Sequence, residues 1–430
     1  MSPVPEGSDL TPPDTEWFTD ARFGLFIHFG LYANAARHEW VKNREKISDE
    51  DYQKYFDHFD PDLFDPQAWA KAAWDAGMRY FVVTTKHHEG FALWDTKLSD
   101  YSAPNTPYGK DLIGPMVEAF RGQGHHVGFY HSVIDWYHPE FPVDGLHSQR
   151  DDEEFKTTHA DRDITKYAEY LHGQVRELLT NYGKVDVMWF DFSYPNRVWG
   201  GKGRNDWQSE KLDHMVRELQ PGIIVNDRLD LDNADLTTPE QVQPVGNVVT
   251  PGSGPQLWEA CQTLNGSWGY DRDNSDWKSP ELVVRMLIDT VSKGGNMLMN
   301  VGPNGRGEWE PQALETLRGV GAWMRVNERS IRGNGPSDFI PPADARYTQK
   351  GNRLYLHLLA WPFGMVHLAG LGGKVEYAQF LHDGSEVRIV QPHSDGHVSV
   401  NGLAADVLSL RLPQRAPAVA VPVIELFLKP

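Results

Sequence analysis

Residues 65–86, DPQAWAKAAWDAGMRYFVVTTK, contain one complete helix followed by a strand and therefore decide the class of fold. Asp65 is a typical N-cap, the proline after it suits the first turn of a helix, and Gly77 is a typical helix stop. The run RYFVVTT that follows is mostly apolar and β-branched, as expected for a strand buried on both faces. The pattern predicts a helix packed against a parallel sheet.

The same alternation continues from about residue 20 to residue 330. Further strands are predicted at FGLFIHF (23–29), VGFYHS (127–132), VDVMWFD (185–191), GIIVNDR (222–228), LWEA (257–260) and NMLMNV (296–301). Helices are predicted between them at about 112–124, 163–182, 206–220, 281–295 and 310–328. Repetition on this scale favours an α/β fold with a (β/α)8-like barrel over an open sheet. Irregular spacing after residue 227 leaves room for a distorted or incomplete barrel.

The pattern changes after about residue 335. Short runs that alternate apolar and polar residues are separated by Gly, Pro and Asp, which predicts an all-β sandwich. The runs are RLYLHLLAW, VEYAQFL, SEVRIVQ, HVSVNGL, LSLRL and VIELFL. The proline-rich segment PSDFIPPADAR (336–346) marks the boundary, so we predict a barrel domain over 1–335 and a β-sandwich over 336–430.

Composition limits the partners and the compartment. The net charge of −19 argues against nucleic acid, because binding to phosphates depends on basic patches. No apolar run approaches the length of a membrane span, and the N-terminal segment has neither a basic start nor an apolar core typical of a signal peptide. The single cysteine, Cys261, permits no internal disulfide and suits the cytoplasm. A homo-oligomer remains possible.

Polar side chains follow five of the predicted strands at their carboxyl ends. In a barrel these ends meet at one rim, where the chemistry is carried out. Each residue alone has a structural explanation, such as helix capping for an aspartate, but their shared placement favours one site. The residues are His28; His87, His88 and Glu89; Tyr130 and His131; Trp189 and Asp191; and Asn226, Asp227 and Arg228, with Glu39 and Trp40 in the loop after the first strand.

Two reaction classes fit these residue types. A metal-dependent hydrolase could use the strand-end cluster His28, His87, His88 and Asp191 as ligands. Glycoside hydrolysis needs two carboxyl groups. It also needs hydrogen-bonding side chains and aromatic walls around the sugar, which Glu39 and the tryptophans could supply. The sequence contains no GxSxG serine elbow and no GxGxxG or GxxxxGK[ST] phosphate loop.

Nine motifs, in order over about residues 15–335, resemble the retaining α-L-fucosidase family of glycoside hydrolases. They are WFTDARFGLFIHFGLYA, EWV, TTKHHEGFALWDTKLSDYS, VGFYHSVIDWYHP, VDVMWFD, VNDR, TPEQ, LWEACQTLNGSWGY and DTVSKGGNMLMNVGPNGRGE. The resemblance implies a distorted (β/α)8 barrel followed by a β-sandwich. It also implies hydrolysis of terminal α-L-fucosyl residues from oligosaccharides or glycoconjugates through a covalent fucosyl-enzyme, with no metal or cofactor.

The resemblance also implies roles for individual residues. Asp191 matches the family nucleophile, although Phe192 follows it where a small residue is usual. Glu240 in TTPEQ matches the acid/base, and Glu259 in LWEA is the alternative. Trp189 precedes the nucleophile by two residues on the same strand face, and Trp268 matches an aromatic wall for the C5 methyl group. Substrate-binding roles are implied for His28, Glu39, Trp40, His87, His88, Tyr130 and Arg228.

Four questions stay open at this point. A non-catalytic fucose-binding protein would keep the histidines, but candidates for both carboxylates are present. The resemblance does not assign Glu89, and it does not identify the glycosidic linkage that is cut, because variable loops build that part of a site. It also leaves open whether the β-sandwich contacts the substrate.

Overall fold

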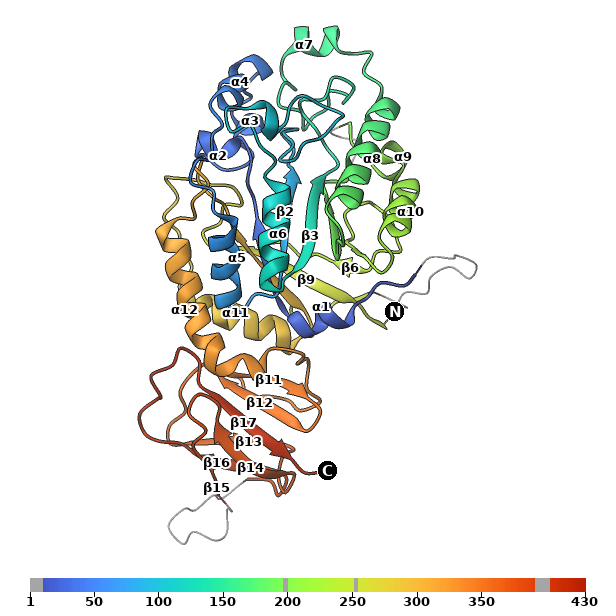
Figure 1. Ribbon diagram of the computed structural model, residues 1–430. Coiled ribbons are helices and arrows are strands. Elements are labelled where there is room, and N and C mark those ends of the chain that lie inside the picture. Colours follow the sequence, from blue (N-terminus) through green and yellow to red (C-terminus); the bar gives the residue numbers. More distant parts are fainter. Residues whose placement is uncertain (1–10, 196–199, 251–253, 391–402) are drawn as a thin grey trace.

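The computed structural model describes residues 11–195, 200–250, 254–390 and 403–430. Figure 1 shows a large part in which helices surround a central sheet, with a smaller part built of strands beyond helices α11 and α12. No helix among the described residues is long and apolar enough to cross a membrane.

The central sheet has eight parallel strands in the order β5-β4-β3-β2-β1-β10-β9-β6. A parallel bridge between Asn226 and Leu236 connects the two edge strands, so the sheet closes into a barrel. The predicted (β/α)8-like barrel is confirmed. Its strands are β1 (Phe23–Ile27), β2 (Tyr80–Lys86), β3 (His126–Ser132), β4 (Val187–Asp191), β5 (Ile224–Val225), β6 (Leu236–Thr237), β9 (Leu257–Thr263) and β10 (Asn296–Val301).

The helices around the barrel lie close to their predicted ranges, and α5 begins and ends at the predicted signals. In helix α5 (Pro66–Asp75) the Asp65 carboxylate accepts a hydrogen bond from the Ala68 N–H at 2.9 Å, and Gly77 follows with φ +93°. The other long helices are α6 (Ile113–Gln123), α8 (Ile164–Asn181), α10 (Ser209–Leu219), α11 (Pro280–Ser292) and α12 (Pro311–Asn327). Shorter helices are α1 (Glu16–Ala21), α2 (Tyr32–Ala35), α3 (Val41–Arg44), α4 (Asp49–Asp57), α7 (Glu153–Thr158), α9 (Arg204–Trp207), η1 (Ala103–Asn105) and η3 (Glu328–Ser330).

The barrel is distorted where the sequence spacing becomes irregular. Between β5 and β9 the described residues form only the short strand β6 and the hairpin of β7 (Val249–Thr250) and β8 (Gly254–Pro255), without a helix. Proline, glycine and aspartate are frequent in this segment, and they favour turns over helices. The segment carries Glu240, so the distortion determines how this glutamate reaches the rim.

The barrel strands are buried on both faces, as their apolar sequences require. One set of side chains fills the interior of the barrel, while the other set packs against the helices. The interior set contains bulky aromatic rings, so the barrel is a packed core with its polar residues at the rim. Its members include Phe26, Tyr80, Tyr130, Trp189, Ile224, Leu236, Cys261 and Leu298.

The C-terminal part consists of two antiparallel sheets with an apolar core between them, which confirms the predicted β-sandwich. One sheet contains β11 (Ala345–Lys350), β12 (Arg353–Leu358), β17 (Val423–Leu428) and β14 (Val375–Phe380), and the other β13 (Met365–Leu368), β16 (Leu408–Arg411) and β15 (Arg388–Val390). The sequence did not predict β11 or β13. The run HVSVNGL (397–403) lies almost entirely outside the described residues. The boundary at 335/336 stays a prediction.

Candidate active site

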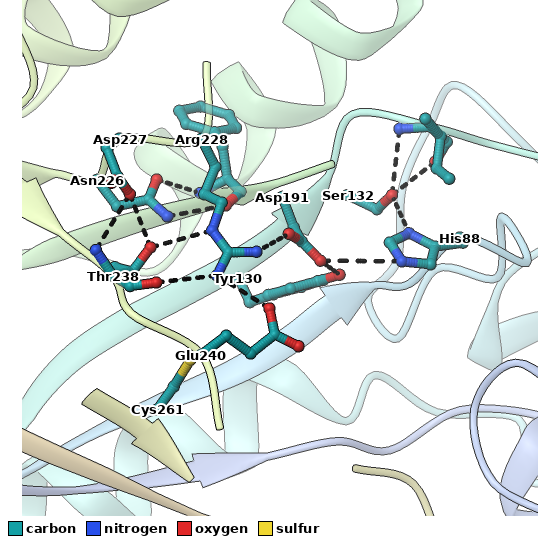
Figure 2. A network of polar contacts seen from close by, with 12 residues as sticks. His88, Tyr130, Ser132, Asp191, Asn226, Asp227, Arg228, Thr238, Glu240 and Cys261 are labelled. Atoms are coloured by element: carbon teal, nitrogen blue, oxygen red, sulfur yellow. Dashed lines mark hydrogen bonds and ion pairs between the residues drawn. The ribbon is translucent and has the colours of Figure 1, made fainter. Parts of the chain in front are cut away.

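The carboxylate of Asp191, the last residue of β4, lies at the centre of the polar network in Figure 2. The Tyr130 hydroxyl donates to Oδ2 at 2.7 Å, and the Arg228 guanidinium donates to Oδ1 at 2.9 Å. His88 Nε2 lies 3.8 Å from Oδ2. Asp191 ends β4, and polar groups reach its carboxylate from β3 (Tyr130), from the residues after β5 (Arg228) and from those after β2 (His88), as the strand-end pattern predicted.

Asp191 is nearly buried, with 8% of its surface exposed. Burial raises the pKa of Asp191, and the charge of Glu240 raises it further, whereas Arg228 and the Tyr130 hydroxyl act in the opposite direction. The two donors favour the ionised carboxylate. The site therefore holds a desolvated carboxylate whose charge depends on Arg228.

Arg228 connects Asp191 to a second carboxylate. Nη1 binds Asp191, and Nη2 donates to Glu240 Oε2 at 3.0 Å (Figure 2). The guanidinium also donates to the Thr238 hydroxyl at 3.0 Å and carbonyl at 3.1 Å, and it lies 4.8 Å from the Trp189 ring centre. Burial acts to lower the pKa of Arg228, but the two carboxylates outweigh it and the pKa rises above its ordinary value. Arg228 is a fixed cation between two carboxylates.

Glu240 is held by the distorted part of the barrel. The Cys261 N–H donates to the Pro239 carbonyl at 3.1 Å, and the Gln241 N–H donates to the Cys261 carbonyl at 3.0 Å. This short pairing with β9 fixes the backbone of Glu240 beside the barrel. Its side chain remains 42% exposed. Glu240 is thus open to solvent while it faces the buried Asp191 across Arg228.

His87 and His88 come directly after β2, which ends at Lys86, and their ring centres are 3.9 Å apart. His88 Nδ1 lies 2.7 Å from the Ser132 hydroxyl, which itself donates to the Ile134 carbonyl at 2.8 Å. Ser132 Oγ therefore accepts a hydrogen bond from Nδ1–H, and Nε2 keeps its lone pair. Burial lowers the pKa values of both histidines well below the ordinary range, so both rings are neutral.

His28, which follows the neighbouring strand β1, is oriented in the same way. Its Nδ1 lies 2.7 Å from Asn300 Oδ1, while the Asn300 amide donates to the Trp268 carbonyl at 2.6 Å. Asn300 Oδ1 is thus the acceptor, which leaves the lone pair of His28 on Nε2. Burial lowers the pKa of His28 to about 3. The ring stacks on Trp268 with centres 5.1 Å apart.

The geometry combines two carboxylates on one arginine with neutral histidines and aromatic rings. Comparison with known proteins gives a match between residues 7–329 and the model of the family described as Alpha-L-fucosidase. The chain belongs to the α-L-fucosidase family. It is a glycoside hydrolase, and the resemblance seen in the nine motifs is confirmed.

Relatives with solved structures support this assignment over nearly the whole chain. α-L-Fucosidase isoenzyme 1 from Paenibacillus thiaminolyticus is 47% identical with a TM-score of 0.91, covering 97% of this chain and 99% of that chain. An α-L-fucosidase from Bacteroides thetaiotaomicron, solved as a trapped covalent intermediate with 2-fluoro-fucosyl fluoride, is 27% identical with a TM-score of 0.82 and complete coverage of both chains. Human tissue α-L-fucosidase is 29% identical over 375 residues, which are 81% of this chain and 76% of the human protein.

Glu39 and Trp40 reach the site of this glycoside hydrolase from the loop after β1. The buried Glu39 carboxylate accepts the Gly269 N–H at 2.8 Å, which ties its loop to that of Trp268. Burial raises the pKa of Glu39. The Trp40 ring centre lies 5.0 Å from that of His88. The structure thus gathers all the predicted substrate-binding residues around Asp191 and His28.

Glu259, the alternative acid/base, occupies a different place. It lies in the amino-terminal half of β9, is fully buried, and accepts a hydrogen bond from the hydroxyl of Tyr80, the first residue of β2. Burial raises the pKa of Glu259 to about 7. It is enclosed in the barrel interior, away from the rim where Glu240 meets Arg228.

Glu89 has a structural surrounding. It is buried, accepts the Leu31 N–H at 3.0 Å and is hydrogen-bonded by the Tyr52 hydroxyl. These bonds join the loops after β1 and β2 to helix α4. Burial raises the pKa of Glu89 to about 7. Glu89 therefore fixes the loops that carry the histidines.

Sequence reasoning missed the residues that orient the site. Ser132 and Asn300 set the tautomers of His88 and His28, and Thr238 holds Arg228. Ser132 and Asn300 also stand at or next to the carboxyl ends of strands, so the strand-end rule could have included them. The described residues include no group of three or more His, Cys, Asp or Glu side chains placed to hold a metal ion, so their geometry does not favour the metal-dependent alternative.

Proposed function

We propose that this enzyme removes terminal α-L-fucosyl residues from oligosaccharides or glycoconjugates by double displacement, with Asp191 as nucleophile and Glu240 as acid/base. The observation that carries the assignment is the single Arg228 guanidinium that binds both carboxylates. A retaining mechanism needs two carboxyl groups close together on either side of the glycosidic bond. The covalent intermediate trapped in the Bacteroides relative supports the same chemistry here.

In the first step Asp191 Oδ attacks the anomeric carbon while protonated Glu240 gives its proton to the departing glycosidic oxygen. The C1–O bond breaks, and an ester forms between C1 and Asp191. The leaving alcohol departs neutral. Tyr130 and Arg228 hold the attacking carboxylate in place, because each donates to one of its oxygens.

In the second step ionised Glu240 takes a proton from water, and the water oxygen attacks C1. The ester bond breaks, Asp191 leaves as a carboxylate, and fucose is released with its configuration retained. The partial exposure of Glu240 gives water access to this side of the sugar. Arg228 stabilises the returning charge on Asp191.

The rest of the site would bind the sugar. Neutral His28 and His88 present acceptor nitrogens to hydroxyl groups, and Trp40 and Trp268 supply aromatic surface. We place the C5 methyl group of fucose against Trp268, because an apolar wall leaves the extra hydroxyl of a hexose unpaired. The apolar wall alone lowers kcat/KM for a hexoside relative to a fucoside by a factor on the order of 100. The contacts to the sugar hydroxyls therefore contribute the larger share of selectivity.

The nucleophile can be tested by Asp191→Gly. Hydrolysis of 4-nitrophenyl α-L-fucoside should fall by roughly four orders of magnitude, as for other catalytic carboxylates. Azide should restore release of 4-nitrophenol and give β-fucosyl azide, because a small anion can occupy the space of the carboxylate. Near-wild-type activity of the variant, or rescue that yields the α-azide, would contradict the assignment.

A further inference from the structure

Phe192, the residue after Asp191, has an unusual backbone conformation. Its φ of +75° lies in the left-handed region, and among the described non-glycine residues with positive φ it is the one with a large apolar side chain. This conformation costs about 1–2 kcal/mol for an L-residue with a Cβ atom. Such strain persists where the surrounding structure enforces it, often at functional sites.

Left-handed residues also adjoin the other carboxylates of the site. His38 (φ +59°) precedes Glu39, and Gln241 (φ +55°) follows Glu240. The backbone is therefore turned beside each of the carboxylates Asp191, Glu39 and Glu240. At Asp191 the turn has an additional effect, since it directs an aromatic ring toward the site.

The Phe192 ring belongs to an aromatic cluster on the histidine side of Asp191. Its centre lies 5.0 Å from that of His88 in an edge-on arrangement and 5.2 Å from that of Trp40. Trp40 in turn lies 5.0 Å from His88. His88 is buried, whereas Phe192 and Trp40 are half-buried. The two partly exposed rings thus stand in front of His88 and form a wall beside the nucleophile.

The position of His88 indicates which part of the sugar this wall faces. Its free Nε2 lies 3.8 Å from Asp191 Oδ2, and Asp191 must bond to C1 of the sugar. C1 is joined within the ring to O5 and C2, and only C2 carries a hydroxyl. The hydroxyl that can reach His88 while C1 is on Asp191 is therefore the 2-hydroxyl.

We propose that Phe192 and Trp40 close the pocket around the 2-hydroxyl, so that Phe192 makes the enzyme select fucosides whose 2-hydroxyl is unsubstituted. The inference rests on the proposed assignment of Asp191 as nucleophile. A hydroxyl fits between His88 and the two rings, whereas an alkyl or glycosyl group on the same oxygen meets the Phe192 ring. The strained turn is kept because it places that ring.

The test compares hydrolysis of 4-nitrophenyl α-L-fucoside with that of its 2-O-methyl and 4-O-methyl ethers. In Phe192→Gly the ratio of kcat/KM for the 2-O-methyl ether to that for the parent should rise about 10-fold or more. Space for one additional methyl group usually changes kcat/KM by at least this factor. The ratio for the 4-O-methyl ether should stay at the wild-type value, because C4 lies across the ring from C1. Phe192→Tyr should keep the wild-type ratios.

Two further variants distinguish the effect of the Phe192 ring from the effect of backbone strain. Phe192→Ala removes the ring and keeps the strain, so its ratios should match those of Phe192→Gly while its Tm is lower. Lys46→Gly relaxes another left-handed residue (φ +52°) whose side chain is 53% exposed, and it should leave all ratios unchanged. Where turnover of an ether is too slow, inhibition constants of L-fucose and 2-O-methyl-L-fucose give the same comparison.

The outcomes distinguish the inference from the function on which it rests. Absence of hydrolysis of the parent fucoside by the wild-type enzyme would refute the proposed function. If the wild-type enzyme is active but Phe192→Gly keeps the wild-type ratio for the 2-O-methyl ether, the inference is wrong. An equal rise for the 2- and 4-O-methyl ethers would also overturn it, since the ring would then only stiffen the pocket.

Discussion

The two sides of the site differ in charge. On one side Asp191, Arg228 and Glu240 form a chain of ions joined by bonds of 2.9 and 3.0 Å. On the other side His28, His87 and His88 are neutral, and Asn300 and Ser132 fix two of them. The difference shows that one rim of the barrel can keep charged groups and neutral hydrogen-bonding groups on separate sides. In the mechanism that we propose, the charge that changes during the reaction lies around Arg228, and the sugar hydroxyls bind to rings that carry no charge.

The comparison is tested most severely by removing Glu240, the proposed acid/base. For Glu240→Ala we expect kcat/KM to fall by about 10²–10⁴-fold on fucosides with poor leaving groups, which need the proton. The loss should be small for 2,4-dinitrophenyl fucoside, which leaves unaided. Rates on a series of aryl and alkyl fucosides measure this dependence.

Glu259→Ala is the matched control for that series. Glu259 is enclosed in the barrel interior, so its loss should not depend on the leaving group. If Glu259→Ala shows the steep dependence and Glu240→Ala does not, the two assignments must be exchanged.

Arg228→Ala should produce the next largest effect, a loss on the order of 10²–10³-fold comparable to the loss of a charge-stabilising group in other active sites. Burial raises the pKa of Asp191, and Arg228 opposes this effect. Without the arginine the pKa of Asp191 rises further, so the acid limb of the kcat/KM profile should move to higher pH. The pH profile of the variant gives the measurement.

Arg204→Ala controls for the removal of an arginine. Arg204 pairs with the more exposed Asp230 and Asp232, and such surface pairs contribute little. Its profile should match that of the wild type. An unchanged acid limb in Arg228→Ala would show that the limb does not report Asp191.

A smaller effect is expected on the neutral side. Ser132→Ala removes the acceptor that keeps the proton on His88 Nδ1, so kcat/KM should fall about 10-fold, the value of one lost hydrogen bond. Because we propose that His88 faces the 2-hydroxyl, the loss should disappear on a 2-deoxyfucoside. Ser385→Ala, in an exposed turn of the β-sandwich, should be neutral on both substrates. Equal losses for Ser132→Ala on both substrates would contradict the contact to the 2-hydroxyl.

These two sides were not equally predictable from the sequence. The barrel and its rim followed from continuous apolar strands that end in polar residues, which identified His28, Asp191 and Arg228. Motif order then favoured Glu240 over Glu259 as the acid/base, and this assignment stays a prediction. The orienting residues Ser132 and Asn300 escaped notice because a serine or an asparagine in a strand has no distinctive signal.

Other features depend on tertiary contacts that no local pattern contains. Strands β11 and β13 were missed because ARYTQK and MVHL are short and the first alternates with charged residues. The left-handed turn at Phe192 was unpredictable, since a phenylalanine disfavours that conformation. The pairing of Glu240 with β9 joins residues about twenty positions apart through backbone bonds, which side-chain patterns do not show.

The smallest expected effect is that of replacing Glu259. It tests whether a charge in the barrel interior influences the residues at the rim. Burial raises the pKa of this carboxyl to about 7, above the value of about 4.3 for an unfolded chain. As the pH rises above the unfolded value, the unfolded state loses its proton first, so this residue contributes stability at low pH that is lost as the pH approaches 7. Glu259→Gln keeps the shape of the side chain and removes the titration. The decline in Tm between pH 5 and pH 8 should therefore be smaller in Glu259→Gln than in the wild type, and the pH profile of kcat/KM should not change. A shifted kinetic profile would show that the charge of Glu259 reaches the rim, and the separation between interior and site would then be wrong.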